Sequence, residues 1–428
     1  ISLTFTPGVG LDLGAVTLAD APGGAQAAMM TVSKARLSVE LLPLLLGEVR
    51  PTALTLEGAE IRLMRDDNGN PNWDFAAAGA PRDPLDVLSF GDVRLIDSRI
   101  LIDPDGEQRE LNFVDARLRW PDGAPSLSVA GEIAFRSERF EVEALIEQPH
   151  ALFSGRLVPL RLAFSSGLAE GELDGDIDLP GDSFEGGVTI TAPSARRLAA
   201  FFGALIPGDR GFGETSLAAA IRAGRGEVHL RDIKFTLDDM TGGGDLGIRL
   251  AGPRLSFAGA LSIDSFDLAA YLAPAAPDAG AGWSDAPVDL SGLREVDANL
   301  ALNLRSATLA GMKVSNLHAT FALTRGRALL DVTSAALNAG MGRARLAFDA
   351  GPESPVWALT LTLTDFDAQS FFADAIASDA LTGRGSLSLD LRATGATRRA
   401  IVSGLAGSLQ LELVNGSLDG VDLAAVAR

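Results

Sequence analysis

The stretch VWALTLTLTDFDAQSFFADAI, residues 356–376, decides how this chain folds. Its first half alternates apolar with small or polar residues, a period of two that is typical of a strand with one apolar face. The apolar members are Trp357, Leu359, Leu361 and Leu363. Directly after them, Asp365 or Asp367 can cap a helix by accepting its first free backbone N–H groups. The stretch therefore predicts a strand that runs into a short helix.

The residues after the cap have helical spacing, and their apolar side is expected to turn back towards the sheet. They are Phe371, Phe372, Ala375 and Ile376. The same strand-and-helix pattern recurs in residues 255–272, LSFAGALSIDSFDLAAYL, and in residues 188–205, VTITAPSARRLAAFFGAL. In the latter, Ser194 is the expected cap, and the apolar stripe is Leu198, Phe201, Phe202 and Leu205. Recurrence at long intervals predicts one extended sheet with helices on its apolar face. Chance similarity between amphipathic elements is the alternative.

Composition limits the classes of function. The 428 residues include 56 Asp and Glu against 36 Lys and Arg, a net charge of -20. Such a surface repels phosphate backbones and anionic headgroups, so nucleic-acid partners and attachment to an acidic bilayer surface are disfavoured. The absence of cysteine removes disulfides and thiolate metal sites, and fits an extracytoplasmic location.

No run of the sequence reaches the ~18 apolar residues that a membrane-spanning helix needs. The chain begins at Ile1 without a methionine and stops within a helix-like pattern at Arg428. We therefore expect a fragment from which a signal or anchor has been cut away.

The sequence contains few motifs that are typical of catalytic or metal-binding sites. His150, His229 and His318 stand far apart, without the partners of a catalytic triad. Residues 66–70 imitate the start of a calcium loop, but Pro71 replaces the required glycine and Ala77 the bidentate glutamate. We expect no enzyme activity and no cofactor.

A further group of carboxylates, Asp174, Asp176 and Asp178, shares one strand face without a fourth ligand and is interpreted as a solvated face. The glycine-rich segments 241–244 and 208–213 lack the Lys-Ser/Thr of a phosphate loop and are interpreted as turns.

Several segments resemble the AsmA family of bacterial envelope proteins, related to the TamB and YhdP group. They are LLPLLLGEV (41–49), LEGAEIRL (56–63), DDNGNPNWDF (66–75), GWSDAPVDLSGLREVDANLALNLRSATLAGMKVSNL (282–317) and residues 385–426. The chain departs from the family pattern at residues 338–341, NAGM, where an aromatic-Gly-Gly turn is common. The resemblance implies a bridge-like lipid transfer protein, anchored in the inner membrane, whose periplasmic taco-shaped β-groove carries phospholipid towards the outer membrane.

We predict a mainly β protein: a long, curled antiparallel sheet with a few short helices on its apolar face or ends. The predicted parts are an amino-terminal module (1–80), central β-groove repeats (81–272), a linker or exposed loop (273–287) and a carboxy-terminal groove region (288–428).

Leucines that recur on one face of four predicted strands are the candidate lipid-binding residues. They are Leu300, Leu302, Leu304, Leu359, Leu361, Leu363, Leu387, Leu389, Leu391, Leu409, Leu411 and Leu413. An acyl chain is the natural ligand of an uncovered apolar face, because each buried methylene contributes ~0.8 kcal/mol. Packing in a closed core is the alternative for every one of these leucines. A second hypothesis is an envelope assembly factor that pairs its strand edges with outer-membrane or envelope protein partners.

Overall fold

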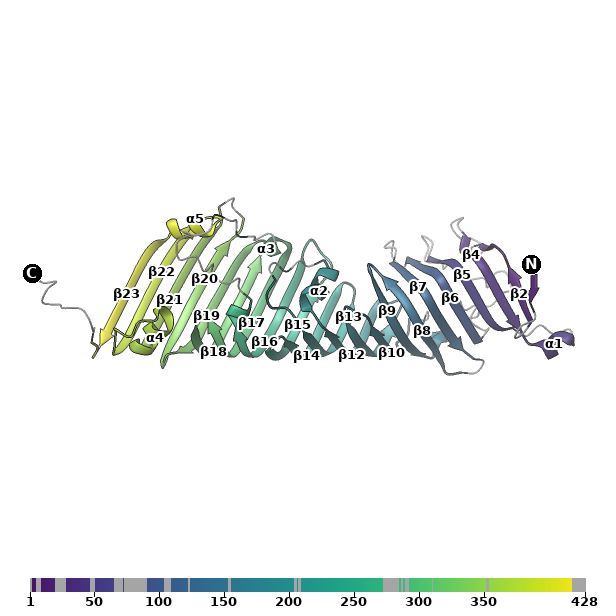
Figure 1. Cartoon of the computed structure of the whole chain (residues 1–428), viewed down its shortest axis with the longest axis horizontal. Helices are drawn as coiled ribbons and strands as arrows, with labels where there is room; N and C mark the ends of the chain where they lie inside the picture. Colours follow the sequence, from purple (N-terminus) through teal and green to yellow (C-terminus); the bar gives the residue numbers. More distant parts are fainter. Residues whose placement is uncertain are drawn as a thin grey trace, which may run out of the picture. The chain divides into compact units, whose positions relative to one another are not determined.

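The computed structural model describes most of the chain and consists mainly of β-strands, which confirms the predicted fold class (Figure 1). The described residues are 2–4, 9–19, 28–46, 51–64, 72, 91–103, 109–121, 124–152, 155–203, 206, 209–271, 285, 288, 292–309, 311–351 and 354–417. The chain divides into two compact units, Ile1–Ile190 and Thr191–Arg428. Each unit is described by itself.

The first unit is a sheet in which most strands pair with their neighbours in sequence. Its strands are β1 (Ser2–Thr4), β2 (Val9–Leu13), β3 (Val16–Ala19), β4 (Ala28–Val39), β5 (Pro51–Met64), β6 (Gly91–Asp103), β7 (Arg109–Trp120), β8 (Ser126–Phe135), β9 (Glu138–Glu147), β10 (Val158–Ser165), β11 (Glu170–Asp178) and β12 (Ser183–Ala192), whose last two residues belong to the second unit. The helices are α1 (Leu41–Leu45) and the 3-10 turn η3 (Pro149–Ala151). From β6 to β11, each strand pairs antiparallel with the next.

The second unit is also a sheet in which most strands pair with their neighbours in sequence. Its strands are β13 (Thr215–Gly224), β14 (Glu227–Leu237), β15 (Met240–Arg249), β16 (Leu255–Asp267), β17 (Val296–Leu309), β18 (Met312–Thr324), β19 (Arg327–Leu337), β20 (Gly340–Asp349), β21 (Val356–Asp367), β22 (Arg384–Thr394) and β23 (Ala406–Val414). The helices are α2 (Ala195–Phe201), the 3-10 turn η4 (Leu268–Ala270), α3 (Gly292–Glu295), α4 (Ala368–Ile376) and α5 (Arg398–Ser403). Apart from β16 and β17, consecutive strands pair antiparallel.

Among the described strands, two pairs are parallel rather than antiparallel, which the sequence did not reveal. They are β5 with β6 in the first unit and β16 with β17 in the second. A parallel pair needs a connection that returns along the whole strand, and these are the places where long stretches separate consecutive strands. The second stretch contains the predicted linker, 273–287, which apart from Asp285 lies outside the described residues.

The predicted helix caps are confirmed. The Ser194 hydroxyl accepts a hydrogen bond from the Arg197 N–H at 3.2 Å, and Asp367 accepts one from the Ser370 N–H at 2.8 Å. Hydrogen bonds from Ser370 also lower the pKa of the Asp367 carboxyl. In the middle copy the helix is only the 3-10 turn η4.

The predicted apolar stripes are only partly correct. Phe371 is buried, but Ile376 at the end of α4 is 67% exposed and Phe202 is 64% exposed. These helices are so short that their last turn no longer reaches the sheet. Leu205 lies outside the described residues.

Bulges interrupt five long strands at residues with positive φ: Gly58 in β5, Asp97 in β6, Asp232 in β14, Asn316 in β18 and Asp365 in β21. The strand registers shift or skip at these positions. As a result, residues three apart face the same side; Leu363 and Phe366, for example, are both fully buried. Because a bulge bends a strand and increases its twist, these positions help the sheets to curve.

The turn between β19 and β20 carries a strained alanine. Asn338 and Ala339 both have positive φ, 47° and 62°, as a type I′ turn requires, and such turns favour Asn-Gly. We expect Ala339→Gly to raise the free energy of unfolding by about 1 kcal/mol, because the left-handed conformation is costly for alanine and free of strain for glycine. Urea unfolding followed by circular dichroism measures this change in the free energy of unfolding.

Ala336→Gly, within β19, is the control. It is expected to lower the stability by about 0.5–1 kcal/mol, since glycine weakens a strand interior. Equal destabilisation by both substitutions would contradict the account of the turn.

Candidate functional site

The candidate leucines lie on one face of the second unit, in rows that cross the strands. In one row Leu302, Ala319, Val332, Ala344, Leu361, Leu389 and Leu409 are successive register partners from β17 to β23. A second row links Leu300, Phe321, Leu330, Leu346, Leu359 and Leu391. We call this side of the second unit the apolar face.

The remaining candidates extend the same face towards the other end of the strands. Leu304 pairs with Leu317, and Leu363 pairs with Leu387, which pairs with Leu411. Leu413 lies opposite Gly385, the partner of Phe366. The structure therefore brings all twelve leucines to one surface, although they come from four separate strands.

The burial of these leucines matches neither a closed core nor a freely exposed surface. Leu363 and Leu387 are buried, whereas Leu409 is 66% exposed. The other nine are half-buried: Leu300, Leu302, Leu304, Leu359, Leu361, Leu389, Leu391, Leu411 and Leu413. Much of the face is thus shielded by its own neighbours and still accessible from one side.

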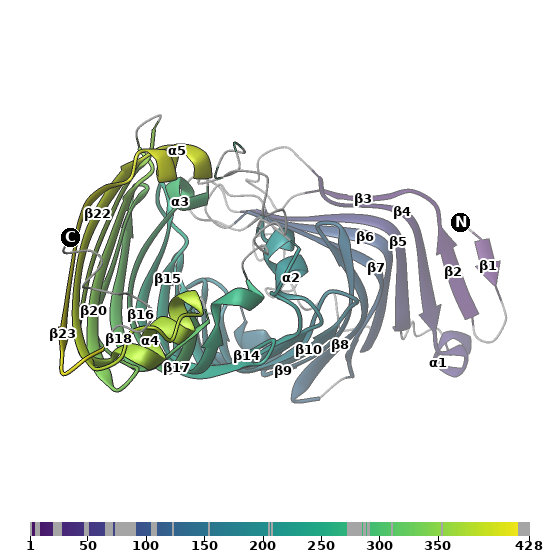
Figure 2. The ribbon, with the colours of Figure 1, turned by 60° about the vertical axis from the view of Figure 1, so that its left-hand side comes forward.

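Helix α4 covers only part of the apolar face. Phe371 of α4 packs with Leu363, Phe366 and Leu387 in one buried cluster, which Met312, Leu411 and Leu413 border. Figure 2 shows the strands of this unit curving, with α4 on the inside of the curve. Since α4 packs on the leucine rows, the apolar face is the inner face of the curved sheet.

The opposite face is polar and exposed. Arg345 and Asp331 form a salt bridge of 2.7 Å across β19 and β20, and Arg327 pairs with Asp349 at 3.0 Å. Thr360 and Thr362 are exposed beside the leucines of β21. This division gives the sheet one face suited to water and one suited to apolar ligands.

The rows are long compared with a lipid tail. The first row crosses seven strands, from β17 to β23, and neighbouring strands lie ~4.8 Å apart, so this row spans about 29 Å; the second row crosses the six strands from β17 to β22. One leaflet of a bilayer contributes half of its ~30 Å hydrocarbon core. The apolar face can therefore accommodate an acyl chain along its length.

The first unit has an apolar face of its own. Its buried cluster is formed by Val32, Ala35, Leu56, Ala59, Val93 and Leu95. Across the strands, Leu54, Val93, Leu118 and Val129 are successive register partners. Arg36 with Asp12, at 2.6 Å, and Lys34 with Glu57, at 2.8 Å, form exposed ion pairs between strands of the same unit.

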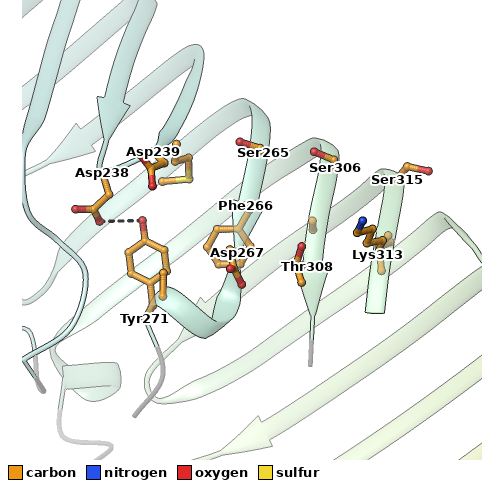
Figure 3. A pocket seen from close by; sticks show the side chains of 14 residues that line it. Asp238, Asp239, Ser265, Phe266, Asp267, Tyr271, Ser306, Thr308, Lys313 and Ser315 are labelled. Carbon is orange, nitrogen blue, oxygen red and sulfur yellow. Dashed lines mark hydrogen bonds between the residues drawn. The ribbon is translucent and has the colours of Figure 1, made fainter. Parts of the chain in front are cut away.

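A pocket of about 520 Å³ lies beside the apolar face, at the ends of β16, β17 and β18 (Figure 3). Its wall includes η4 and the β14–β15 turn, which Tyr271 and Asp238 join through a hydrogen bond of 3.1 Å. Asp238 also accepts the N–H groups of Phe212 and Gly213, at 2.9 and 2.8 Å. Burial, and then the bond to Asp238, raise the pKa of the Tyr271 hydroxyl to about 12, so it remains a hydrogen-bond donor at neutral pH.

The three histidines have separate surroundings. His150 lies against Trp120, with ring centroids 4.3 Å apart, His229 is 3.6 Å from Glu227, and His318 shares a hydrogen bond of 2.7 Å with Asn303. Among the described residues, no group of three or more His, Cys, Asp or Glu side chains is placed to hold a metal ion.

The glycine-rich segment 241–244 lies within strand β15, so its interpretation as a turn is wrong. Other predicted segments have structural roles or fall outside the described residues. Asp178 accepts the Gly181 N–H at 3.0 Å within a turn, and Asp174 faces Arg161 at 3.7 Å. The calcium-like segment 66–70 is outside the described residues. Within the part that is described, no helix has the length and apolarity to cross a membrane.

Sequence reasoning missed the pocket and the bulges. The bulges had a signal, because the spacing of apolar residues changes from two to three around an Asp, Asn or Gly, as in Leu363-Thr-Asp-Phe366 and Leu230-Arg-Asp-Ile233. The pocket had none, since its walls come from segments that are distant in sequence.

Comparison with family models gives a match to the AsmA family over residues 1–83 and 250–428. Curated proteins and solved structures yield no match. The matched residues include each of the segments on which the resemblance rested, and they make up more than half of the chain. The chain belongs to the AsmA family.

Proposed function

We propose that this chain shields the acyl chains of phospholipids on its apolar face, as the periplasmic part of an inner-membrane-anchored protein that moves lipid between the inner and outer membranes. The observation that carries the proposal is the set of half-buried leucine rows, which run across six or seven strands and which α4 covers only in part. Family membership is consistent with this role.

The proposal assigns binding, and no chemical step, to the chain. An acyl chain that lies along the leucine rows would remove methylene groups from water, each worth ~0.8 kcal/mol. It needs no directional partner, so it can slide from strand to strand without breaking hydrogen bonds. The polar headgroup would remain at the rim, in water.

The test is native mass spectrometry with lipid extraction on the purified protein. We expect bound phospholipid, and we expect Leu389→Asp and Leu409→Asp to reduce it at least fivefold, because an acyl chain that packs on a carboxylate removes water from the charge without replacing its hydrogen bonds. Leu409 is the more informative position, since a residue already 66% exposed can become charged with little effect on folding.

Thr362→Asp is the matched control, because Thr362 is exposed on the opposite face of β21. Its lipid content should equal that of the unmodified protein. Lipid-free, well-folded protein would overturn the proposal, and so would folded variants that keep their full lipid content.

A second candidate function is an envelope assembly factor that binds client strands. It is favoured by β23, which among the described strands pairs with β22 only, and whose Leu409 and Val414 are 66% and 60% exposed. An added strand would satisfy the free edge and cover both side chains. Client binding without bound lipid would favour this function.

A further inference from the structure

Helix α1 of the first unit exposes a group of large apolar side chains. Leu41, Leu42 and Leu45 of α1 and Leu46, the residue that ends it, are between 52% and 84% exposed, and we call these four leucines the α1 patch. Because a helix turns by about 100° per residue, they share one side of α1. Single exposed leucines are common on protein surfaces, but a contiguous group marks an interaction site.

The composition and size of the α1 patch favour a lipid bilayer over a protein partner. The patch is entirely aliphatic, whereas Trp, Tyr and Arg dominate the binding energy of protein interfaces and leucine is under-represented there. Each partner of a stable protein interface buries ~800 Å², and four leucines supply less than that. Hydrocarbon needs neither a large matching surface nor a directional polar group.

The backbone of α1 is also suited to an apolar environment. Backbone groups that enter hydrocarbon must be hydrogen-bonded within the chain. The Leu46 N–H donates to the Pro43 carbonyl at 2.9 Å, and the Leu44 N–H donates to the Glu40 carbonyl at 3.3 Å. Pro43 itself has no N–H. The end of α1 can therefore leave water without losing these hydrogen bonds.

The α1 patch lies at one end of the strands that form the first unit's apolar face. Ala35 of β4 is buried in the cluster of that face, and Leu37 pairs with Leu54, which packs against the cluster. Helix α1 begins at Leu41, two residues after β4 ends, and Figure 2 shows it at the end of that strand. A bilayer that holds the patch would therefore meet the first unit at this end of its strands.

We propose that the α1 patch inserts into a lipid bilayer and attaches this end of the first unit to the membrane surface. Transfer of lipid from that bilayer to the adjoining apolar face would rest on the proposed function, but the contact itself does not. Four leucines have about the apolar size of a single acyl anchor, so the attachment is reversible.

Charge determines which bilayer the α1 patch prefers. The chain has a net charge of -20, and Glu40, next to the patch, is exposed. Anionic headgroups repel this charge, whereas zwitterionic headgroups do not. Insertion is therefore favoured in a zwitterionic bilayer and opposed in an anionic one.

The test is flotation of the purified protein with phosphatidylcholine vesicles in a density gradient. We expect part of the protein to float, and we expect Leu42→Asp and Leu46→Asp to reduce the floating fraction at least fivefold, because a carboxylate resists transfer into hydrocarbon. These leucines are 76% and 84% exposed, so the substitutions leave the fold intact. Vesicles with about 30% phosphatidylglycerol should bind at least twofold less protein at low salt.

Leu157→Asp is the matched control. Leu157 is 60% exposed in the same unit but lies outside the α1 patch, so the variant adds the same charge and should float like the unmodified protein. Equal flotation of the patch variants and the unmodified protein would overturn the proposal. So would a dimer, detected by light scattering, that Leu42→Asp dissociates, since the patch would then bind a second copy.

Lipid extraction separates this contact from the proposed function. If Leu42→Asp loses flotation but the purified variant keeps its bound lipid, both proposals are supported. Lipid-free protein that floats through the α1 patch would retain the bilayer contact and overturn the proposed function. Lipid-loaded protein that does not float would overturn the contact alone.

Discussion

Phe366→Ala is expected to lower the free energy of unfolding of the second unit by about 3–5 kcal/mol, the range for removing a buried aromatic side chain. Phe366 is fully buried, and its ring centroid lies 4.8 Å from that of Phe371. The ring occupies space left by Gly385 on β22, because a Cβ there would lie 2.5 Å from the Cζ of Phe366, and a Cβ at Gly340 on β20 would lie 2.8 Å from the Cβ of Phe366.

Urea unfolding followed by circular dichroism measures this loss, with Ile376→Ala as the control. Ile376 is the last residue of α4, the helix that follows β21, and is 67% exposed, so its truncation should cost less than about 0.5 kcal/mol. A loss below about 1 kcal/mol for Phe366→Ala would show that α4 is not anchored to the sheet through this ring.

Gly259→Ala is expected to cost about 3 kcal/mol, although it adds a single methyl group. A Cβ at Gly259 would lie 2.1 Å from the Asp245 carbonyl oxygen on β15. The obstacle is backbone rather than a side-chain tip, so β15 and β16 must separate locally and weaken their hydrogen bonds.

Gly247→Ala tests the same strand pair without the clash. The nearest atom to a Cβ there is the His229 Nδ1 at 3.4 Å, a side-chain atom that can move. Its stability should change by less than about 0.5 kcal/mol. Similar losses for the two variants would mean that the loss of glycine flexibility, rather than strand separation, determines the effect.

The strands and caps could be predicted because both are encoded locally. Alternation of Leu with Thr or Ser gives the strands of the second unit, and a side-chain oxygen three residues before a free N–H gives the caps at Ser194 and Asp367. The parallel pairing of β16 with β17 could not be predicted, because strand direction depends on where a long connection returns, and alternation is identical in both directions.

The shared face of the candidate leucines could be predicted from the sequence, but the exposure of each leucine could not. That the twelve leucines share one side follows from strand periodicity and register. The burial of Leu363 beside the exposure of Leu409 depends on the position of α4 and on the sheet edge, which no local pattern records. Likewise, the segments that line the pocket come together only after β14 to β18 have assembled.

The order of strand pairing has a consequence for folding kinetics. Almost every strand bonds to the strand that precedes it in the chain, so most contacts close short loops, and formation can proceed hairpin by hairpin at small entropic cost. The pairs β5–β6 and β16–β17 differ, since 26 and 28 residues separate their strands in the sequence, so each pairing closes a longer loop. We expect the formation of these two parallel strand pairs to determine the slow phases of refolding, one in each unit.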